Sequence, residues 1–136
     1  MQNNSLIFTA TYNESENIKT FLDIALKLNN IDILIIDDNS PDGTAKVIKE
    51  YQKDYKNLYL IVREGKEGLD TAHKQAYKYA IKKNYLNLIT MDADLSHDPS
   101  KIPMFLEELN SYPFVIGSRY IKGGRNETKL SRYLLS

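Results

Sequence analysis

Residues 86–99 read LNLITMDADLSHDP and join a short apolar run to a cluster of acidic residues. The run at 86–91 has the length and the aliphatic composition of a buried strand. Asp92 and Asp94 follow it directly, separated by Ala93. In extended backbone, side chains two residues apart point the same way, with Cα atoms about 7 Å apart. This pair is therefore a candidate site for a hard divalent cation that also carries a phosphate. The alternative is a solvated acidic turn, because such tripeptides are common.

Four further apolar runs have the length of strands, and residues between them recur at helical spacing. We predict strands at residues 5–10, 31–36, 58–62 and 113–117. Asn13 and Glu16 resemble a capping box for the first helix, Ser40 or Asp42 could cap the second, and Ser100 could cap the last. The predicted inward faces are Ile18, Phe21, Leu22, Ala25 and Leu28; Val47, Ile48 and Tyr51; Ala72, Ala76, Tyr79 and Ala80; and Ile102, Phe105, Leu106 and Leu109.

This alternation of strands and helices predicts an α/β fold: a mostly parallel sheet with helices on both faces, in a Rossmann-like three-layer arrangement. With 136 residues, we expect one domain over residues 1–136. The chain balances 18 Lys and Arg against 18 Asp and Glu, which disfavours a general nucleic-acid binder. It has no Cys, no apolar run of about 20 residues and no signal-peptide pattern. We therefore expect a cytoplasmic protein.

Polar clusters follow four of the predicted strands: Tyr12 with Glu14, Asp37 with Asp38, Asp92 with Asp94, and Ser118 with Arg119. Ligands of parallel α/β sheets gather beyond the carboxyl ends of the strands, so these clusters predict one shared site. Carboxylates there can accept hydrogen bonds from a ribose hydroxyl or a base N–H. Neither glycine-rich phosphate motif is present, so a cation and Arg119 would have to neutralise phosphate charge.

The motifs TYNESENI, DDNSPDGT, GLDTA, MDADLSHDP and GSRYIKGG, in this order and spacing, resemble family 2 glycosyltransferases of the GT-A fold. Within that family the resemblance is to the polyprenyl-phosphate (dolichol-phosphate) mannosyltransferases. It covers essentially the whole chain. DDNSPDGT together with GSRYIKGG is the specific part of the pattern, whereas Asp-x-Asp alone is weak evidence.

The resemblance implies a role for each matching residue. The nucleotide-sugar would be bound by Ala10, Tyr12, Glu14, Ile36, Asp38, Asp92, Ala93 and Asp94. Asp92 and Asp94 would hold Mg²⁺ or Mn²⁺, and Asp94 and Arg119 would be catalytic. The acceptor phosphate would be bound by Ser118, Arg119 and Arg132.

The implied reaction is a metal-dependent transfer of a hexose, with inversion, to a polyprenyl or dolichyl phosphate at the membrane surface. GDP-mannose is the expected donor, and UDP-glucose is the second choice. A phosphate acceptor is already ionised at neutral pH, so no general base is needed. The basic stretch at 122–132 would suit an acidic lipid headgroup, although a solvated tail explains its charge equally well. Lys74, Lys78, Lys82 and Lys83 are expected to form a solvated helix face.

Several positions depart from the family pattern. Asp70 and Ala76 stand where glycines are usual, and Ser96 stands where a Gln that helps the metal is common. His97 is expected to be a structural hydrogen-bonding residue rather than a ligand. The family's catalytic domain also continues well past residue 136, so the chain is either a shortened form or a natural remnant. We expect it to bind nucleotide and metal but to transfer sugar poorly.

Two other functions remain open from the sequence. A family 2 enzyme could act instead on a saccharide hydroxyl in surface polysaccharide synthesis, with a general base downstream of Ser136. A receiver-type signalling domain also has a parallel sheet and an Asp pair at a strand end. Receivers need an Asp after the third strand and a Lys after the fifth, where this chain has Arg63 and Arg119.

Overall fold

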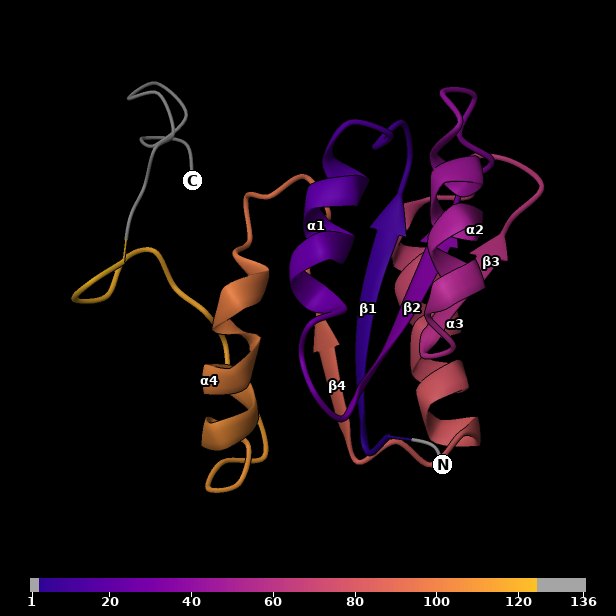
Figure 1. The fold of residues 1–136 in the computed structure, drawn as a ribbon. Helices are drawn as coiled ribbons and strands as arrows, with labels where there is room; N and C mark the ends of the chain where they lie inside the picture. Colours follow the sequence, from indigo (N-terminus) through magenta and orange to yellow (C-terminus); the bar gives the residue numbers. More distant parts are fainter. Residues whose placement is uncertain (1–2, 125–136) are drawn as a thin grey trace.

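A computed structural model describes residues 3–124 of the chain. Its elements are β1 (Ser5–Thr11), α1 (Asn17–Ala25), β2 (Ile31–Asp37), α2 (Thr44–Asp54), β3 (Leu58–Val62), α3 (Leu69–Lys82), β4 (Asn87–Thr90), the 3₁₀ turn η1 (Pro99–Lys101) and α4 (Ile102–Glu108). The four strands form one parallel sheet in the order β3-β2-β1-β4 (Figure 1). All four predicted strands from residues 5 to 91 are present, within two residues at each end.

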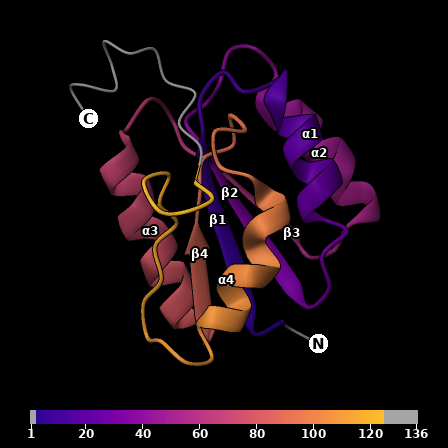
Figure 2. The ribbon, with the colours of Figure 1, turned by 90° about the vertical axis from the view of Figure 1, so that its left-hand side faces the viewer.

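Alternating side chains of the central strands divide the core between the two faces of the sheet. Ile7, Ile33 and Ile35 pack with apolar residues of α1 and α2 and with Ile102 of α4. Leu6, Phe8, Leu34 and Ile36 pack with Ala72, Ala76 and Ala80 of α3. The predicted three-layer arrangement is thus confirmed, with α3 on one face and α1 and α2 on the other (Figure 2). Small alanine side chains let α3 lie close to the sheet.

Three predictions about the helices were wrong in detail. Asn13 and Glu16 form no capping box: α1 begins at Asn17, and Asn13 adopts a left-handed φ of 58°. The last helical segment is capped by Asp98, whose Oδ1 accepts the N–H of Ser100 at 2.9 Å, so Ser100 is not the cap. In α4 Ile102 is buried and Leu106 packs against the core as predicted, but Phe105 and Leu109 are only half-buried.

The predicted fifth strand at residues 113–117 is absent. Phe114 and Ile116 are 74% and 71% exposed. Gly117 lies against α4 instead, since a Cβ built on it would stand 2.8 Å from Cζ of Phe105. The end of this segment therefore contacts a side chain of α4 and forms no strand. Composition showed what this segment could form, but it could not show which neighbour it would meet.

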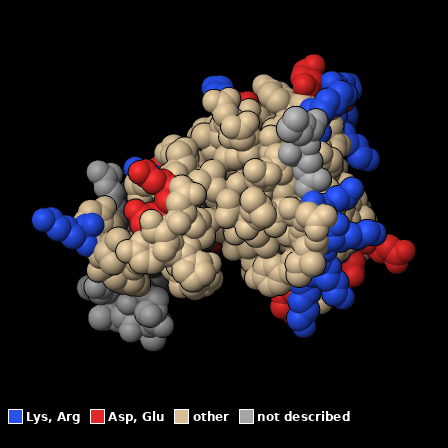
Figure 3. Space-filling view, turned by 90° about the horizontal axis from the view of Figure 1, so that it is seen from below, with Lys and Arg blue, Asp and Glu red and all other residues tan. Residues whose placement is uncertain are grey.

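No helix within residues 3–124 combines the length and the hydrophobicity required to cross a bilayer. The outer face of α3 exposes Lys74, Lys78 and Lys82, in agreement with the expected solvated face. Seen from the amino ends of the strands, Lys and Arg gather mainly on the side away from α4 (Figure 3).

Candidate functional site

The carboxyl ends of the strands form an edge that we call the rim: the loops at 12–16, 38–43, 63–68 and 91–98. The N–H of Asp38 donates to the carbonyl of Thr11, and the N–H of Met91 donates to the carbonyl of Phe8, both at 3.1 Å. The chains leaving β1, β2 and β4 therefore emerge on the same edge. Three of the four predicted clusters lie there. Two predicted nucleotide-binding residues inside the strands, Ala10 and Ile36, are register partners just below it.

The loop after β1 is held by side chains of the loop after β2. The backbone N–H groups of Asn13, Glu14 and Ser15 donate to side chains across the gap. Their acceptors are Ser40 Oγ at 2.9 Å, Thr44 Oγ1 at 3.0 Å and Asp42 Oδ2 at 2.9 Å. Three consecutive amides are thereby satisfied without regular secondary structure. Ser40, Asp42 and Thr44 of DDNSPDGT thus shape the loop that follows β1 and carries the Tyr12 and Glu14 side chains.

Asp37 is a structural residue of this rim. Its side chain is fully buried. It accepts hydrogen bonds from Thr11 Oγ1 at 2.7 Å, from Ser40 N–H at 2.9 Å and from Ser40 Oγ at 2.6 Å. Of the two carboxylates predicted at this strand end, Asp37 is therefore occupied by donors of the protein itself. Its carboxylate ties the end of β1 to the turn after β2.

Asp42 should make the stability of this loop pair depend on pH. Burial raises its pKa, but hydrogen bonds from Thr44 and Ser15 outweigh this effect and lower the pKa of Asp42 from 3.8 to about 2. A carboxyl group whose pKa is depressed in the folded state stabilises the fold above its unfolded pKa, and this contribution is lost as pH falls through the folded value. We expect Asp42→Asn to melt below wild type at about pH 5, with the difference shrinking toward about pH 2. Thermal melts across this range measure it, and a difference that stays constant with pH would contradict it.

Asp38 and Arg63 form a buried ion pair that organises the loop after β3. Arg63 Nε donates to Asp38 Oδ1 at 2.5 Å, and the two side chains are 6% and 10% exposed. The remaining guanidinium nitrogens donate to Thr71 Oγ1 at 2.7 Å and to the Gly68 carbonyl at 2.8 Å. Asp38 Oδ2 accepts the N–H groups of Glu67 and Gly68 at 3.1 and 3.3 Å. The predicted nucleotide contact of Asp38 thus involves a carboxylate that already has three donors.

Sequence reasoning missed the role of Arg63. It was considered only as a mismatch to a receiver domain, although a signal was available. An Arg directly after a predicted buried strand needs a carboxylate partner, because an unpaired buried charge is costly. The predicted strand at 31–36 is followed by two carboxylates, Asp37 and Asp38.

Tyr12 and Lys66 meet on the rim. The Tyr12 side chain is 40% exposed, and Lys66 Nζ lies 4.5 Å from the centroid of its ring. A partly exposed aromatic ring at the edge of a parallel sheet offers a flat surface on which a nucleobase can stack. The structure therefore presents Tyr12 in a form that suits its predicted role.

Asp92 and Asp94 are both exposed, and Ala93 between them is 2% exposed. Asp94 Oδ1 accepts the hydroxyl of Ser96 at 2.6 Å and its N–H at 3.0 Å. These hydrogen bonds, the hydroxyl foremost, outweigh burial and hold the pKa of Asp94 below its usual value. Asp94 is therefore ionised at neutral pH. Ser96 stands where the family commonly has a Gln that helps the metal, and here it donates hydrogen bonds to the carboxylate of Asp94.

His97 supports the same turn as a structural residue, as expected. Its Nδ1 accepts the N–H of Asp92 at 2.9 Å, and its Nε2 lies 3.9 Å from Asp92 Oδ2. One ring nitrogen is thus committed to the backbone. The other faces the carboxylate that was predicted to bind metal.

The chemistry of the acidic pair fits a hard divalent cation. Within residues 3–124, no three His, Cys, Asp or Glu side chains are grouped as metal ligands. Two carboxylates alone leave most positions around Mg²⁺ or Mn²⁺ to water and to phosphate oxygens of a ligand, which is how such ions are commonly held in nucleotide sites. Asp92 and Asp94 therefore suit a metal that arrives with its nucleotide.

The predicted acceptor cluster, unlike the other three, does not follow a strand. Ser118 and Arg119 are exposed and follow the segment that forms no strand, so no strand end delivers them to the rim. Ser118 Oγ accepts the N–H of Tyr120 at 3.2 Å. Arg132 lies outside the described residues. Three of the four predicted clusters thus follow strands that end on this edge, and the place of Ser118 and Arg119 in the site stays a prediction.

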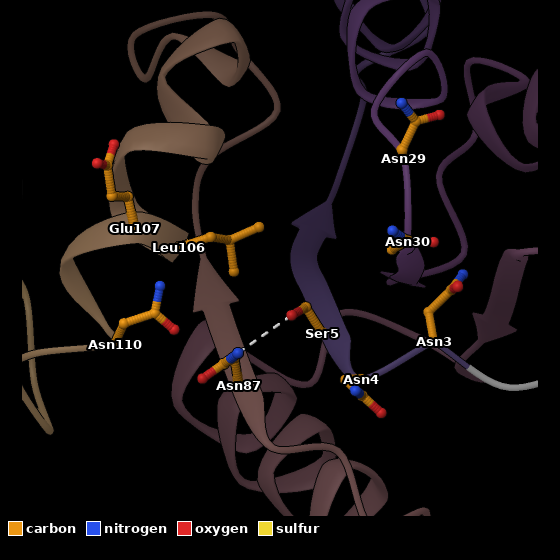
Figure 4. Close-up of a pocket in the computed structure, with 9 residues that line it drawn as sticks. All are labelled: Asn3, Asn4, Ser5, Asn29, Asn30, Asn87, Leu106, Glu107 and Asn110. Atoms are coloured by element: carbon orange, nitrogen blue, oxygen red, sulfur yellow. Dashed lines mark hydrogen bonds between the residues drawn. The ribbon is translucent and has the colours of Figure 1, made fainter.

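A polar hollow of about 530 Å³ lies at the opposite edge of the sheet (Figure 4). Its lining joins the start of β1 and β4 to the far end of α4: Asn3, Asn4, Ser5, Asn29, Asn30, Asn87, Leu106, Glu107 and Asn110. Asn87 Nδ2 donates to Ser5 Oγ at 3.2 Å within it. It contains none of the predicted site residues.

Comparison with known proteins gives consistent results. The family model described as glycosyl transferase family 2 matches residues 6–134. An undecaprenyl-phosphate mannosyltransferase of Micrococcus luteus is 33% identical over 88% of this chain, and a dolichol-phosphate mannosyltransferase of Pyrococcus furiosus is 37% identical over 89%. A polyprenol monophosphomannose synthase of Mycolicibacterium smegmatis is 32% identical over 88%. The chain spans 50%, 34% and 46% of these relatives, respectively.

Among solved structures, the fold is similar to the mannosyltransferase PcManGT from Pyrobaculum calidifontis, determined in complex with GDP-Man and Mn²⁺. The TM-score is 0.66 at 18% sequence identity, over 85% of this chain and 34% of that one. At this identity the likeness concerns the fold. It confirms the predicted GT-A-like architecture.

Proposed function

This chain belongs to glycosyl transferase family 2, and we propose that it binds GDP-mannose with a divalent cation as the donor-binding part of a mannosyltransferase acting on a polyprenyl phosphate. The observation that carries the proposal is the rim. It joins an exposed pair of carboxylates, Asp92 and the ionised Asp94, to a partly exposed Tyr12 on one sheet edge. A nucleoside diphosphate has the matching parts, a flat base and a charged diphosphate that shares a metal.

The residues of the rim would divide the donor between them. Tyr12 would stack on the base, while Ala10, Glu14, Ile36 and Asp38 would line the nucleoside. Asp92 and Asp94 would hold Mg²⁺ or Mn²⁺, with the buried Ala93 keeping both carboxylates turned outward. When bound, the cation would supply charge neutralisation of the departing diphosphate. Asp94 suits this role because its ionisation costs nothing at neutral pH.

On the acceptor side the chain would bind a lipid phosphate with Ser118, Arg119 and Arg132. The attacking oxygen is already ionised, so its positioning in line with the anomeric carbon is the main requirement, and the product would be inverted. Arginine is suited to this task because its planar guanidinium can bind two phosphate oxygens at once. Such an acceptor would place the protein at a membrane surface.

Transfer itself tests the proposal. The chain would be incubated with GDP-mannose, Mn²⁺ and a short polyprenyl phosphate in detergent, and mannosyl-lipid would be measured by mass spectrometry. We expect slow, metal-dependent formation of product, at a low rate because the acceptor side depends on an exposed loop. Dephosphorylated polyprenol serves as the control acceptor and should give none. Product with a simple saccharide but not with the lipid phosphate would overturn the acceptor assignment.

A further inference from the structure

Lys66 has a position on the rim that the proposed function does not use. Its ammonium lies over the ring of Tyr12, with Nζ 4.5 Å from the centroid. Both side chains are accessible. A cation over an aromatic face is attracted by the ring, so the contact gives this otherwise flexible side chain a preferred position. That position is on a face of the ring itself, so a base that stacks on this face would displace the ammonium toward the edge of the base.

The backbone that carries Lys66 is anchored on both sides to one carboxylate. Arg63, three residues earlier, is ion-paired with Asp38 at 2.5 Å. On the other side, the N–H groups of Glu67 and Gly68 donate to Asp38 at 3.1 and 3.3 Å. The short span between these anchors cannot move far from β2 without breaking buried hydrogen bonds. The buried ion pair thus holds Lys66 within reach of Tyr12.

A lysine in this position would distinguish bases by their hydrogen-bonding edges. Its ammonium has three donors and no acceptor. Guanine presents two acceptors on one edge, O6 and N7, which Lys and Arg bind favourably. Adenine presents N7 beside the N6 amino group, which is itself a donor and cannot pair with an ammonium. The same cation would therefore favour guanine and disfavour adenine.

We propose that Lys66 is a specificity-determining residue whose ammonium donates to O6 and N7 of a guanine base stacked on Tyr12. This inference rests on the proposed function, because it requires a nucleotide on the rim. It assigns the preference for guanine, which GDP-mannose requires, to a particular loop residue.

Calorimetric titration with GDP, IDP and ADP, each with Mn²⁺, tests the proposal on wild type and Lys66→Met. Inosine keeps O6 and N7 but lacks the amino group of guanine, so IDP isolates the proposed contact. We expect Lys66→Met to weaken GDP and IDP by about tenfold and to change ADP by less than about twofold. Lys66→Arg should retain the preference for GDP over ADP. Lys74→Met, on the exposed face of α3, is the matched control and should leave all three affinities unchanged.

Three outcomes overturn the proposal. An equal loss for all three nucleotides would mean that Lys66 binds phosphate rather than the base. Unchanged affinities would mean that it does not contact the nucleotide. Wild-type protein that binds none of the three overturns the proposed function and this inference with it. In the first two outcomes wild type still binds nucleotide, so only this inference fails.

Discussion

Arg63→Met is expected to lower the free energy of unfolding by about 3–5 kcal/mol, because it leaves the carboxylate of Asp38 buried without its cation. Both side chains are at most 10% exposed. The guanidinium also donates to Thr71 and to the carbonyl of Gly68, so the loop after β3 loses three connections at once. Urea denaturation followed by circular dichroism measures the change.

The chain offers a matched control for this prediction. Lys53 and Glu50 are also 2.5 Å apart, but their side chains are 68% and 57% exposed. Lys53→Met should therefore leave the free energy of unfolding almost unchanged. The double variant Arg63→Met with Asp38→Leu should recover much of the lost stability, since it removes both charges. A loss below about 1 kcal/mol for Arg63→Met alone would show that the pair is not buried in solution.

Asp94→Asn is expected to weaken GDP binding in the presence of Mn²⁺ by about 100-fold or more. Removing a group that merely supports a metal ligand typically costs 10- to 100-fold, and a ligand should cost at least as much. Binding without metal should change little. Calorimetric titration of wild type and variant, with Mn²⁺ and with chelator, separates the two effects.

Asp98→Asn is the control for this second prediction. Asp98 lies in the same turn, is exposed, and has a pKa lowered by hydrogen bonds from Ser100, just as Ser96 lowers the pKa of Asp94. Asp98 also caps η1, but it has no metal assignment. Equal effects of both substitutions, or metal-independent binding by wild type, would contradict the role given to Asp94.

The parts of the fold that rest on apolar pattern could be predicted from the sequence. The run IDILII became a strand buried along its whole length, because a central parallel strand needs apolar side chains on both faces. The alanines of α3 were predicted to face inward and do so. Such patterns report on burial, and burial dominates the free energy of folding.

The parts that depend on a particular partner could not be predicted in the same way. The segment at 113–117 has the composition of a strand, yet it forms none, and its Gly117 lies against the Phe105 ring. Asn13 looked like a cap for its own helix, but its N–H is bonded to Ser40, 27 residues away. Tyr12, Asp92 and Asp94 were placed together correctly because strand ends share an edge, a property of topology rather than of pairing.

The bonding of the first rim loop to the second has a consequence for how this surface tolerates change. Three amides after β1 depend on Ser40, Asp42 and Thr44, so the first loop depends on the second for its shape. Natural variation in one is therefore constrained by the other, and a transplanted TYNES segment would lose its conformation unless DDNSPDGT travelled with it. The two loops therefore form one structural unit, although they are separated in the sequence.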